Sequence, residues 1–246
     1  MHIDLNKTVG KLTSEFPGAA EAFERLGIDY CCGGNQPLEK ACVALGLPIN
    51  KVVDMLEQAD EKSIQRNFKD WNKDSLTNLV NYIVESHHTF TKKEIQRLTG
   101  LLDKVVKKHA ENHPELRSIT KIFNLLSDEL LVHMQKEELI LFPYIKAIEK
   151  NLETGQPLPR CCFTTVVNPV HMMMQEHETA GKLLMEIREL SNDLTPPPDA
   201  CNSYRVLYDG LLKLEQDLHL HIHLENNVLF PRAIELEPQA VTVTEQ

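Results

Sequence analysis

Residues 221–231 read HIHLENNVLFP, and the rest of the chain is best understood from this stretch. An earlier stretch, residues 133–143, reads HMQKEELILFP. Both contain His-x-x-x-Glu followed by Phe-Pro, with the same spacing between histidine and glutamate (137 − 133 = 4 and 225 − 221 = 4). On a helix, residues four apart lie on the same face. Each copy therefore predicts a helix that points an imidazole and a carboxylate at one volume.

The duplication extends to two further histidines. His87 and His177 are 177 − 87 = 90 residues apart, close to the 221 − 133 = 88 residues between the two motif copies. Each lies in a stripe of apolar residues with steps of three and four, which indicates an amphipathic helix. A pair of helices that carries His and then His-x-x-x-Glu thus occurs twice, and we expect a metal between the two pairs.

Composition limits the classes of function. The chain has 246 residues and a net charge of −10, from 26 Lys and Arg against 36 Asp and Glu. This balance argues against binding of nucleic acid or of an anionic membrane, because both need clustered basic residues. Apolar segments stay short of the ~20 residues of a membrane span. The first residues lack the pattern of a secretory signal, so we expect a cytoplasmic protein with reduced cysteines.

Helical patterns divide the chain into three parts. Residues 1–60 predict a small unit of short helices with a Cys-Cys-Gly-Gly turn, and Gly27 is expected to end one of them. Residues 61–74 are charged and are interpreted as a linker. Residues 75–240 predict four long helices in an antiparallel bundle, so the fold class is all-α. Pro143 is expected to kink or tighten the second long helix, and residues 241–246 are expected to be a loose tail.

Six polar positions face the interior of the predicted bundle. An apolar core tolerates such side chains only when they are paired or bound to a cation. Any one of these histidines alone is more often a satisfied core residue, but the duplicated set favours metal ligation. Nitrogen and oxygen donors without thiolate suit iron or manganese, and two carboxylates can each bridge two ions. The predicted ligands are His87, His133, Glu137, His177, His221 and Glu225.

Other polar residues lie near this set. Glu129 and Glu176 are candidates to hydrogen-bond a ligand imidazole or to line an entry channel, and the alternative is a solvated surface glutamate. His219 and His223 form a rival pair four residues apart. They are expected to point away from the ligand face, as solvated or supporting residues.

Cys31 and Cys32 form a second candidate site, on a glycine-rich turn. If the turn is exposed, their thiolates offer a place to take up metal, react with NO or dock a partner. The alternative is a structural turn with inert thiols. Cys161 and Cys162 carry a weaker case.

DYCCGG at residues 29–34, the two His-x-x-x-Glu helices and LENNVLFP at residues 224–231 together resemble the di-iron iron–sulfur cluster repair proteins of the RIC, or YtfE/ScdA, type. The resemblance covers essentially the whole chain. It implies a ScdA-like N-terminal domain and a hemerythrin-like bundle that holds two iron ions, bridged by an oxo group and by Glu137 and Glu225. It also implies acidic channel positions at Glu129 and Glu176, a cytoplasmic location and a homodimer.

The resemblance implies repair of iron–sulfur clusters after oxidative or nitrosative stress, with damaged iron–sulfur proteins as partners and NO or O2 as small ligands. Donation of iron is the leading interpretation, rather than turnover as an enzyme. Two alternatives stay open: a di-iron enzyme that reduces NO or removes it from nitrosylated clusters, and a hemerythrin-like sensor of O2 or NO.

Overall fold

The computed structural model describes residues 3–16, 18–64 and 69–244, and these residues are helical or lie in turns. Among them, β-type pairing is limited to an isolated bridge between Thr8 and Pro37. The predicted all-α fold class is confirmed. Within the described residues, no helix combines the length and apolar character that crossing a lipid bilayer requires.

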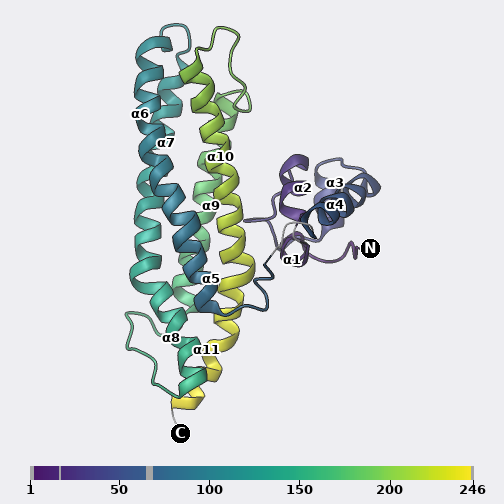
Figure 1. Cartoon of the computed structure of the whole chain (residues 1–246), viewed down its shortest axis with the longest axis vertical. Coiled ribbons are helices and arrows are strands. Elements are labelled where there is room, and N and C mark those ends of the chain that lie inside the picture. The colour runs from purple at the N-terminus through teal and green to yellow at the C-terminus, as the bar shows by residue number, and fades with distance from the viewer. Residues whose placement is uncertain (1–2, 17, 65–68, 245–246) are drawn as a thin grey trace. The chain divides into compact units, whose positions relative to one another are not determined.

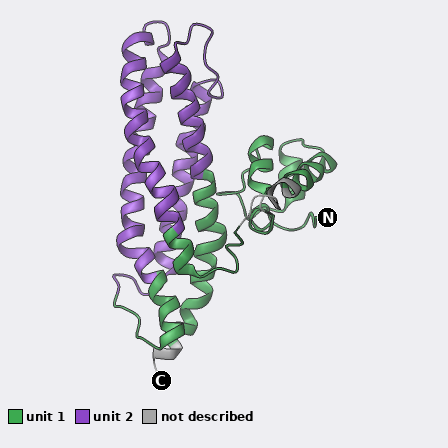
Figure 2. Cartoon of the chain, in the orientation of Figure 1, with its two compact units in different colours: residues 1–81, 145–160, 219–246 green, residues 82–144, 161–218 purple. Residues whose placement is uncertain are grey.

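The chain divides into two compact units, coloured separately in Figure 2. The first unit contains the N-terminal helices together with end segments of the helices predicted for residues 75–240. The second contains the middle of those long helices. The residues of the first unit are 1–81, 145–160 and 219–246, and those of the second are 82–144 and 161–218.

The second unit is a bundle of four helices that run side by side (Figure 1). They are α6 (Thr89–His109), α7 (Glu115–Lys136), α9 (Val167–Leu190) and the part of α10 (Asn202–Leu224) up to Leu218. Short connections between long helices favour antiparallel neighbours. Each helix contributes an apolar stripe to one continuous core, which includes Leu98, Leu102, Phe123, Leu126, Leu184, Ile187, Tyr204 and Leu211.

The first unit begins with four short helices: α1 (Val9–Glu15), α2 (Ala19–Leu26), α3 (Leu38–Ala44) and α4 (Ile49–Ile64). Gly27 ends α2 at φ 66°, in the left-handed region that favours glycine, as predicted. The helix α4 runs to Ile64 and so extends into the segment interpreted as a linker, of which residues 65–68 lie outside the described residues. These helices share a core that includes Val9, Leu12, Phe23, Leu38, Val52 and Leu56.

The same unit contains α5 (Leu76–Tyr82) up to Asn81, α8 (Phe142–Thr154) from Ile145, and α11 (Phe230–Thr244). Glu149 caps α5, because its two carboxylate oxygens accept from the backbone amides of Leu76 at 2.7 Å and Thr77 at 2.9 Å. A carboxylate at this end also complements the helix dipole. The expectation of a loose tail is wrong for residues 241–244, which continue α11.

One end of the second unit is held by His113, which lies between two carboxylates. Its Nε2 lies 3.0 Å from both oxygens of Asp199, and its Nδ1 lies 3.2 Å from Glu115. Both ring nitrogens therefore face acceptors, which favours the imidazolium form. The hydrogen bond to Asp199 raises the pKa of His113 above its usual value of 6.5. His113 therefore links the turn between α6 and α7 to the loop before α10.

This arrangement predicts a pH-dependent contribution to stability. Because the folded pKa of His113 is raised, its stabilisation is complete below the unfolded pKa and is lost as pH rises through the folded pKa. The metal-free His113→Gln variant should therefore lose more unfolding free energy at about pH 5.5 than at about pH 9, measured by urea denaturation against the native chain. An equal loss at both pH values would contradict this assignment.

Candidate metal centre

Three π-helical segments carry residues of the predicted ligand set. They are η1 (Ile83–His88), η2 (Glu137–Leu141) and η3 (Glu225–Leu229). A π-turn holds one more residue than an α-turn and is often found at functional sites. η2 and η3 each begin at the glutamate of a His-x-x-x-Glu motif and are followed directly by Phe-Pro. The turn before Pro143 is therefore wider than an α-turn, and the expected tightening is wrong.

In the second unit, three imidazoles and one carboxylate form a buried cluster. The Nε2 atoms of His88 and His133 lie 3.4 and 3.3 Å from the same oxygen of Glu137. The Nε2 atoms of His177 and His133 are 3.0 Å apart. His133, Glu137 and His177 each offer a ligand atom within 4.8 Å of the other two. All four side chains are buried, so this is a compact set of nitrogen and oxygen donors away from water.

Carboxylates behind the imidazoles fix the orientation of two of these rings. The Nδ1 of His88 lies 2.7 Å from Glu138, and the Nδ1 of His133 lies 2.9 Å from Glu176. A carboxylate at Nδ1 holds the proton there and leaves the Nε2 lone pair for a metal ion. In both residues it is Nε2 that points at Glu137. The proton arrangement favoured in these two rings is thus the one that metal ligation requires.

The structure distinguishes His88 from His87. Both are buried, but the Nδ1 of His87 lies 3.0 Å from Asp217, whereas His88 points its Nε2 at Glu137. On a regular α-helix His87 continues the apolar stripe, and for this reason the sequence predicts it as the ligand. The π-turn of η1 inserts an extra residue into that stripe, which moves the next position along the chain to the inner face. The geometry therefore favours His88 as the donor from this segment.

The other motif copy lies in the first unit. His221 and Glu225 are buried, and the Nε2 of His221 lies 3.0 Å from Oε1 of Glu225. They lie at the end of α10 and the start of η3. The spacing of four residues therefore places this imidazole and carboxylate together, as it does for His133 and Glu137.

A pocket of about 420 Å³ opens beside the cluster of the second unit, between α7 and α9. Its lining includes His133 and His177 at the inner end and the carboxylates of Glu129 and Glu176. The hydrogen bond from His133, assisted by Lys136, lowers the pKa of Glu176 to about 2. The Lys136 ammonium pairs with the other oxygen of this carboxylate. The two acidic positions singled out in the sequence thus line the same pocket as His133 and His177.

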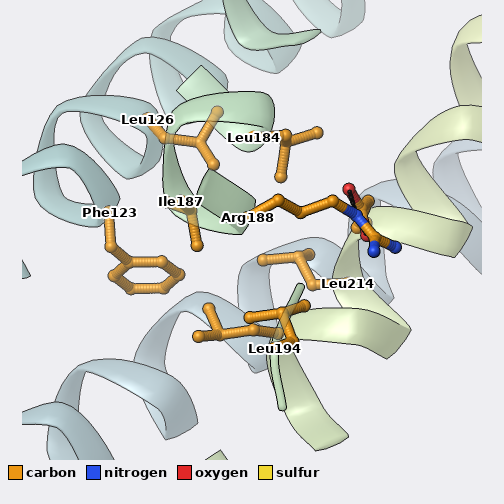
Figure 3. A pocket seen from close by; sticks show the side chains of 9 residues that line it. Phe123, Leu126, Leu184, Ile187, Arg188, Leu194 and Leu214 are labelled. Atoms are coloured by element: carbon orange, nitrogen blue, oxygen red, sulfur yellow. Dashed lines mark hydrogen bonds and ion pairs between the residues drawn. The ribbon is translucent and has the colours of Figure 1, made fainter. Parts of the chain in front are cut away.

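A much smaller cavity, of about 10 Å³, lies in the core of the same unit (Figure 3). Figure 3 shows Leu126, Leu184 and Leu214 around it, with Arg188 at one side. The Nε of Arg188 donates to both oxygens of Glu215, at 2.7 and 2.9 Å. Because its walls are otherwise apolar and it has room for about one water, it is a packing void rather than a metal site.

The thiols of Cys31 and Cys32 are close together, with their sulfur atoms 3.9 Å apart. Asp29 shapes the turn, since its carboxylate accepts from the backbone amides of Cys31, Cys32 and Gly33 at 2.8–3.0 Å. Cys31 is buried, whereas Cys32 is half-buried. The hydrogen bond to Cys32, together with burial, raises the pKa of the Cys31 thiol far above its usual value.

Within the first unit, this turn packs against the segment that carries His221 and Glu225. The side-chain amide of Asn227 donates to the backbone oxygens of Tyr30 at 3.3 Å and Cys31 at 3.2 Å. A Cβ atom on Gly34 would lie 2.7 Å from the Asn227 oxygen, so the close approach requires glycine there. Sequence reasoning missed this contact, although the Asn-Asn pair inside an otherwise apolar helix face was a signal for it.

His219 and His223 also face the N-terminal helices. His219 Nδ1 lies 2.6 Å from Glu24, and the His223 ring packs against Tyr30 with ring centres 5.6 Å apart. Burial lowers the pKa of His223 to about 4, so its imidazole is neutral at pH 7. The expectation that these histidines point away from the ligand face agrees with this placement, but His223 is not solvated.

Comparison with known proteins gives two family matches. Residues 5–60 match ScdA_N, a domain described as of unknown function, and residues 79–233 match the hemerythrin HHE cation binding domain. Relatives named iron-sulfur cluster repair protein YtfE, from Escherichia coli O1:K1, Escherichia fergusonii and Enterobacter sp. (strain 638), are 34% identical over 229 residues. These alignments cover 93% of this chain and 97% of each relative.

The cation-binding domain and the buried histidine and glutamate cluster agree on a metal-binding protein. The relatives match along almost the whole chain, and the two domain matches have the same order as the two regions expected from the sequence. The chain belongs to the YtfE family of iron–sulfur cluster repair proteins, with a ScdA_N domain followed by a hemerythrin HHE cation-binding domain.

Proposed function

We propose that this chain repairs iron–sulfur clusters damaged by oxidative or nitrosative stress, and that it does so by donating iron. The observation that carries the proposal is the buried donor set of three imidazoles and a carboxylate, without thiolate, beside an open acidic pocket. The relatives named for cluster repair support it. The proposed partners are damaged iron–sulfur proteins of the cytoplasm, and the proposed working form is a homodimer.

Two iron ions form the proposed centre, bridged by an oxo group and by carboxylates. Nitrogen and oxygen donors of this kind fit iron, and imidazoles oriented by carboxylates are the usual surroundings of such an ion. We assign the bridges to Glu137 and Glu225. Support for this assignment comes from the duplicated His-x-x-x-Glu motif, which supplies one such glutamate in each copy. The proposed imidazole ligands are His88, His133, His177 and His221, with His87 as the alternative to His88.

The neighbouring histidines allow a matched test of this assignment. His88→Ala should weaken iron binding at least about tenfold, because loss of even a residue that orients a ligand costs that much. His87→Ala should weaken it less, since it is the imidazole of His88 that lies against Glu137. Iron per chain, measured by elemental analysis after dialysis against a graded chelator, decides between them. Circular dichroism checks that both variants fold. The reverse order would restore His87 as the ligand.

Iron leaves, in this proposal, through the pocket lined by Glu129 and Glu176. Carboxylates are good transient ligands for a departing cation, and that of Glu176 remains ionised at neutral pH because its pKa is about 2. The thiols of Cys31 and Cys32 are proposed to engage the iron or the damaged client. Their separation of 3.9 Å would allow both sulfur atoms to bind one ion.

An iron-transfer assay tests the repair function. The native chain loaded with labelled iron should assemble clusters on an apo-ferredoxin, given sulfide and a reductant, faster than the same amount of free iron in the presence of a competing chelator. Glu129→Gln should slow this transfer several-fold and leave the iron content unchanged, because Glu129 lines the pocket without contacting an imidazole. Transfer no better than that of free iron would refute iron donation.

The close contact between Gly34 and Asn227 provides a test of the turn that carries Cys31 and Cys32. Gly34→Ala should lower the unfolding free energy by about 1–3 kcal/mol, because the added methyl group overlaps Asn227 and the Tyr30 carbonyl. It should also speed the reaction of Cys31 with a thiol reagent, since the turn would lose its cover. Gly100→Ala is the matched control, because a Cβ there meets nothing within 4 Å. Unchanged thiol reactivity in Gly34→Ala would contradict this account.

The open pocket also favours a second candidate function, chemistry on NO. A volume of about 420 Å³ that reaches His133 and His177 admits a diatomic gas as readily as it releases an ion. Sustained production of N2O from NO by the iron-loaded chain with an electron donor would support an NO-reducing enzyme. Reversible O2 or NO binding without loss of iron would instead support a sensor.

A further inference from the structure

An exposed face of α7 and of the adjoining η2 carries a line of apolar side chains. Leu125, Val132 and Leu139 are 49%, 56% and 67% exposed, and they are spaced by seven residues (132 − 125 = 7 and 139 − 132 = 7). Ile140, 42% exposed, lies beside Leu139 in the π-turn of η2. Single exposed apolar residues are common, but a spacing of seven residues is the heptad repeat of helices that pair with other helices. The π-turn of η2 holds one extra residue, so Ile140 takes the position that Leu139 would have in an α-helix.

The charges on the same face favour one orientation of a second helix packed against it. Asp128 and Lys136 lie four residues on either side of Val132 (132 − 128 = 4 and 136 − 132 = 4), and both line the nearby pocket. A second copy of α7 in parallel register would place each charge opposite its own kind. An antiparallel copy related by a two-fold axis at Val132 would place Asp128 opposite Lys136 twice, in addition to the pairing of each Lys136 with Glu176 of its own chain.

The apolar residues fit the same symmetry. With the two-fold axis at Val132, Leu125 of one copy lies opposite Leu139 and Ile140 of the other, and the two Val132 side chains meet at the axis. We propose that this face of α7 is the surface through which two copies of the chain form a homodimer. This inference rests on the homodimer included in the proposed function and assigns its interface.

The proposed dimer face also borders the pocket beside the metal cluster. Asp128, Val132 and Lys136 belong both to the pairing face and to the wall of the pocket that reaches His133 and His177. A partner helix on this face would therefore cover part of the pocket mouth. Dimerisation would then limit which ligands and clients reach the imidazoles.

Sedimentation over a range of concentrations tests the interface. Val132→Glu should raise the dimer dissociation constant at least about tenfold, equal to about 1.4 kcal/mol, because two carboxylates would face each other at the axis. Val206→Glu, at a position 38% exposed on α10, is the matched control and should leave the constant unchanged. Circular dichroism and iron content check that both variants fold.

Cross-linking tests the antiparallel symmetry independently. V132C chains should link to each other under mild oxidation, as identified by the linked peptides. L125C should link to L139C in a mixture and not to another L125C chain. Linkage between two L125C chains would overturn the antiparallel arrangement.

The two proposals can fail separately. A native chain that stays monomeric at every concentration would refute the homodimer and its interface together, and the iron-transfer assay would still stand. A dimer that Val132→Glu does not weaken would refute only the assignment of the interface to α7.

Discussion

The structure depends on carboxylates and imidazoles buried together in the protein interior. Glu137 and Glu225 are fully buried, and an ionised carboxylate in such surroundings is costly unless a cation or hydrogen-bond donors compensate for it. Imidazole nitrogens lie 3.0–3.4 Å from each of these carboxylates. A metal ion would satisfy the same atoms at lower cost, because it brings the missing positive charge.

The π-turns show how the backbone adapts to these buried polar side chains. Each His-x-x-x-Glu motif ends in a wide turn, and each wide turn is followed by a proline in the first turn of the next helix. Proline lacks the amide that an α-helix interior uses, so it is tolerated where the regular ladder is already interrupted. The Phe-Pro pair that repeats in the sequence is thus a structural part of the metal-bearing segments. The π-turn that precedes this pair changes which face of the helix points into the core.

Much of this arrangement could be predicted from the sequence. The spacing of His133 and Glu137 fixes their common face on any helix, and apolar periodicity predicts the four long helices. The identity of the first histidine could not be predicted, because a period of 3.6 residues selects His87 and only the π-turn brings His88 inward. The contacts of Asn227 and His223 with the cysteine turn could not be predicted from the sequence either. They join segments about 195 residues apart, and no local pattern encodes such a pairing.

The buried cysteine has a chemical consequence under the conditions in which the chain is proposed to act. Peroxide and related oxidants attack thiolates far faster than protonated thiols. Since hydrogen bonding and burial raise the pKa of Cys31, its sulfur stays protonated at cellular pH. Such a sulfur survives an oxidant pulse that would consume a reactive cysteine. A protein that restores clusters after damage would thereby retain the Cys31 thiol in the reduced form when its clients have lost theirs.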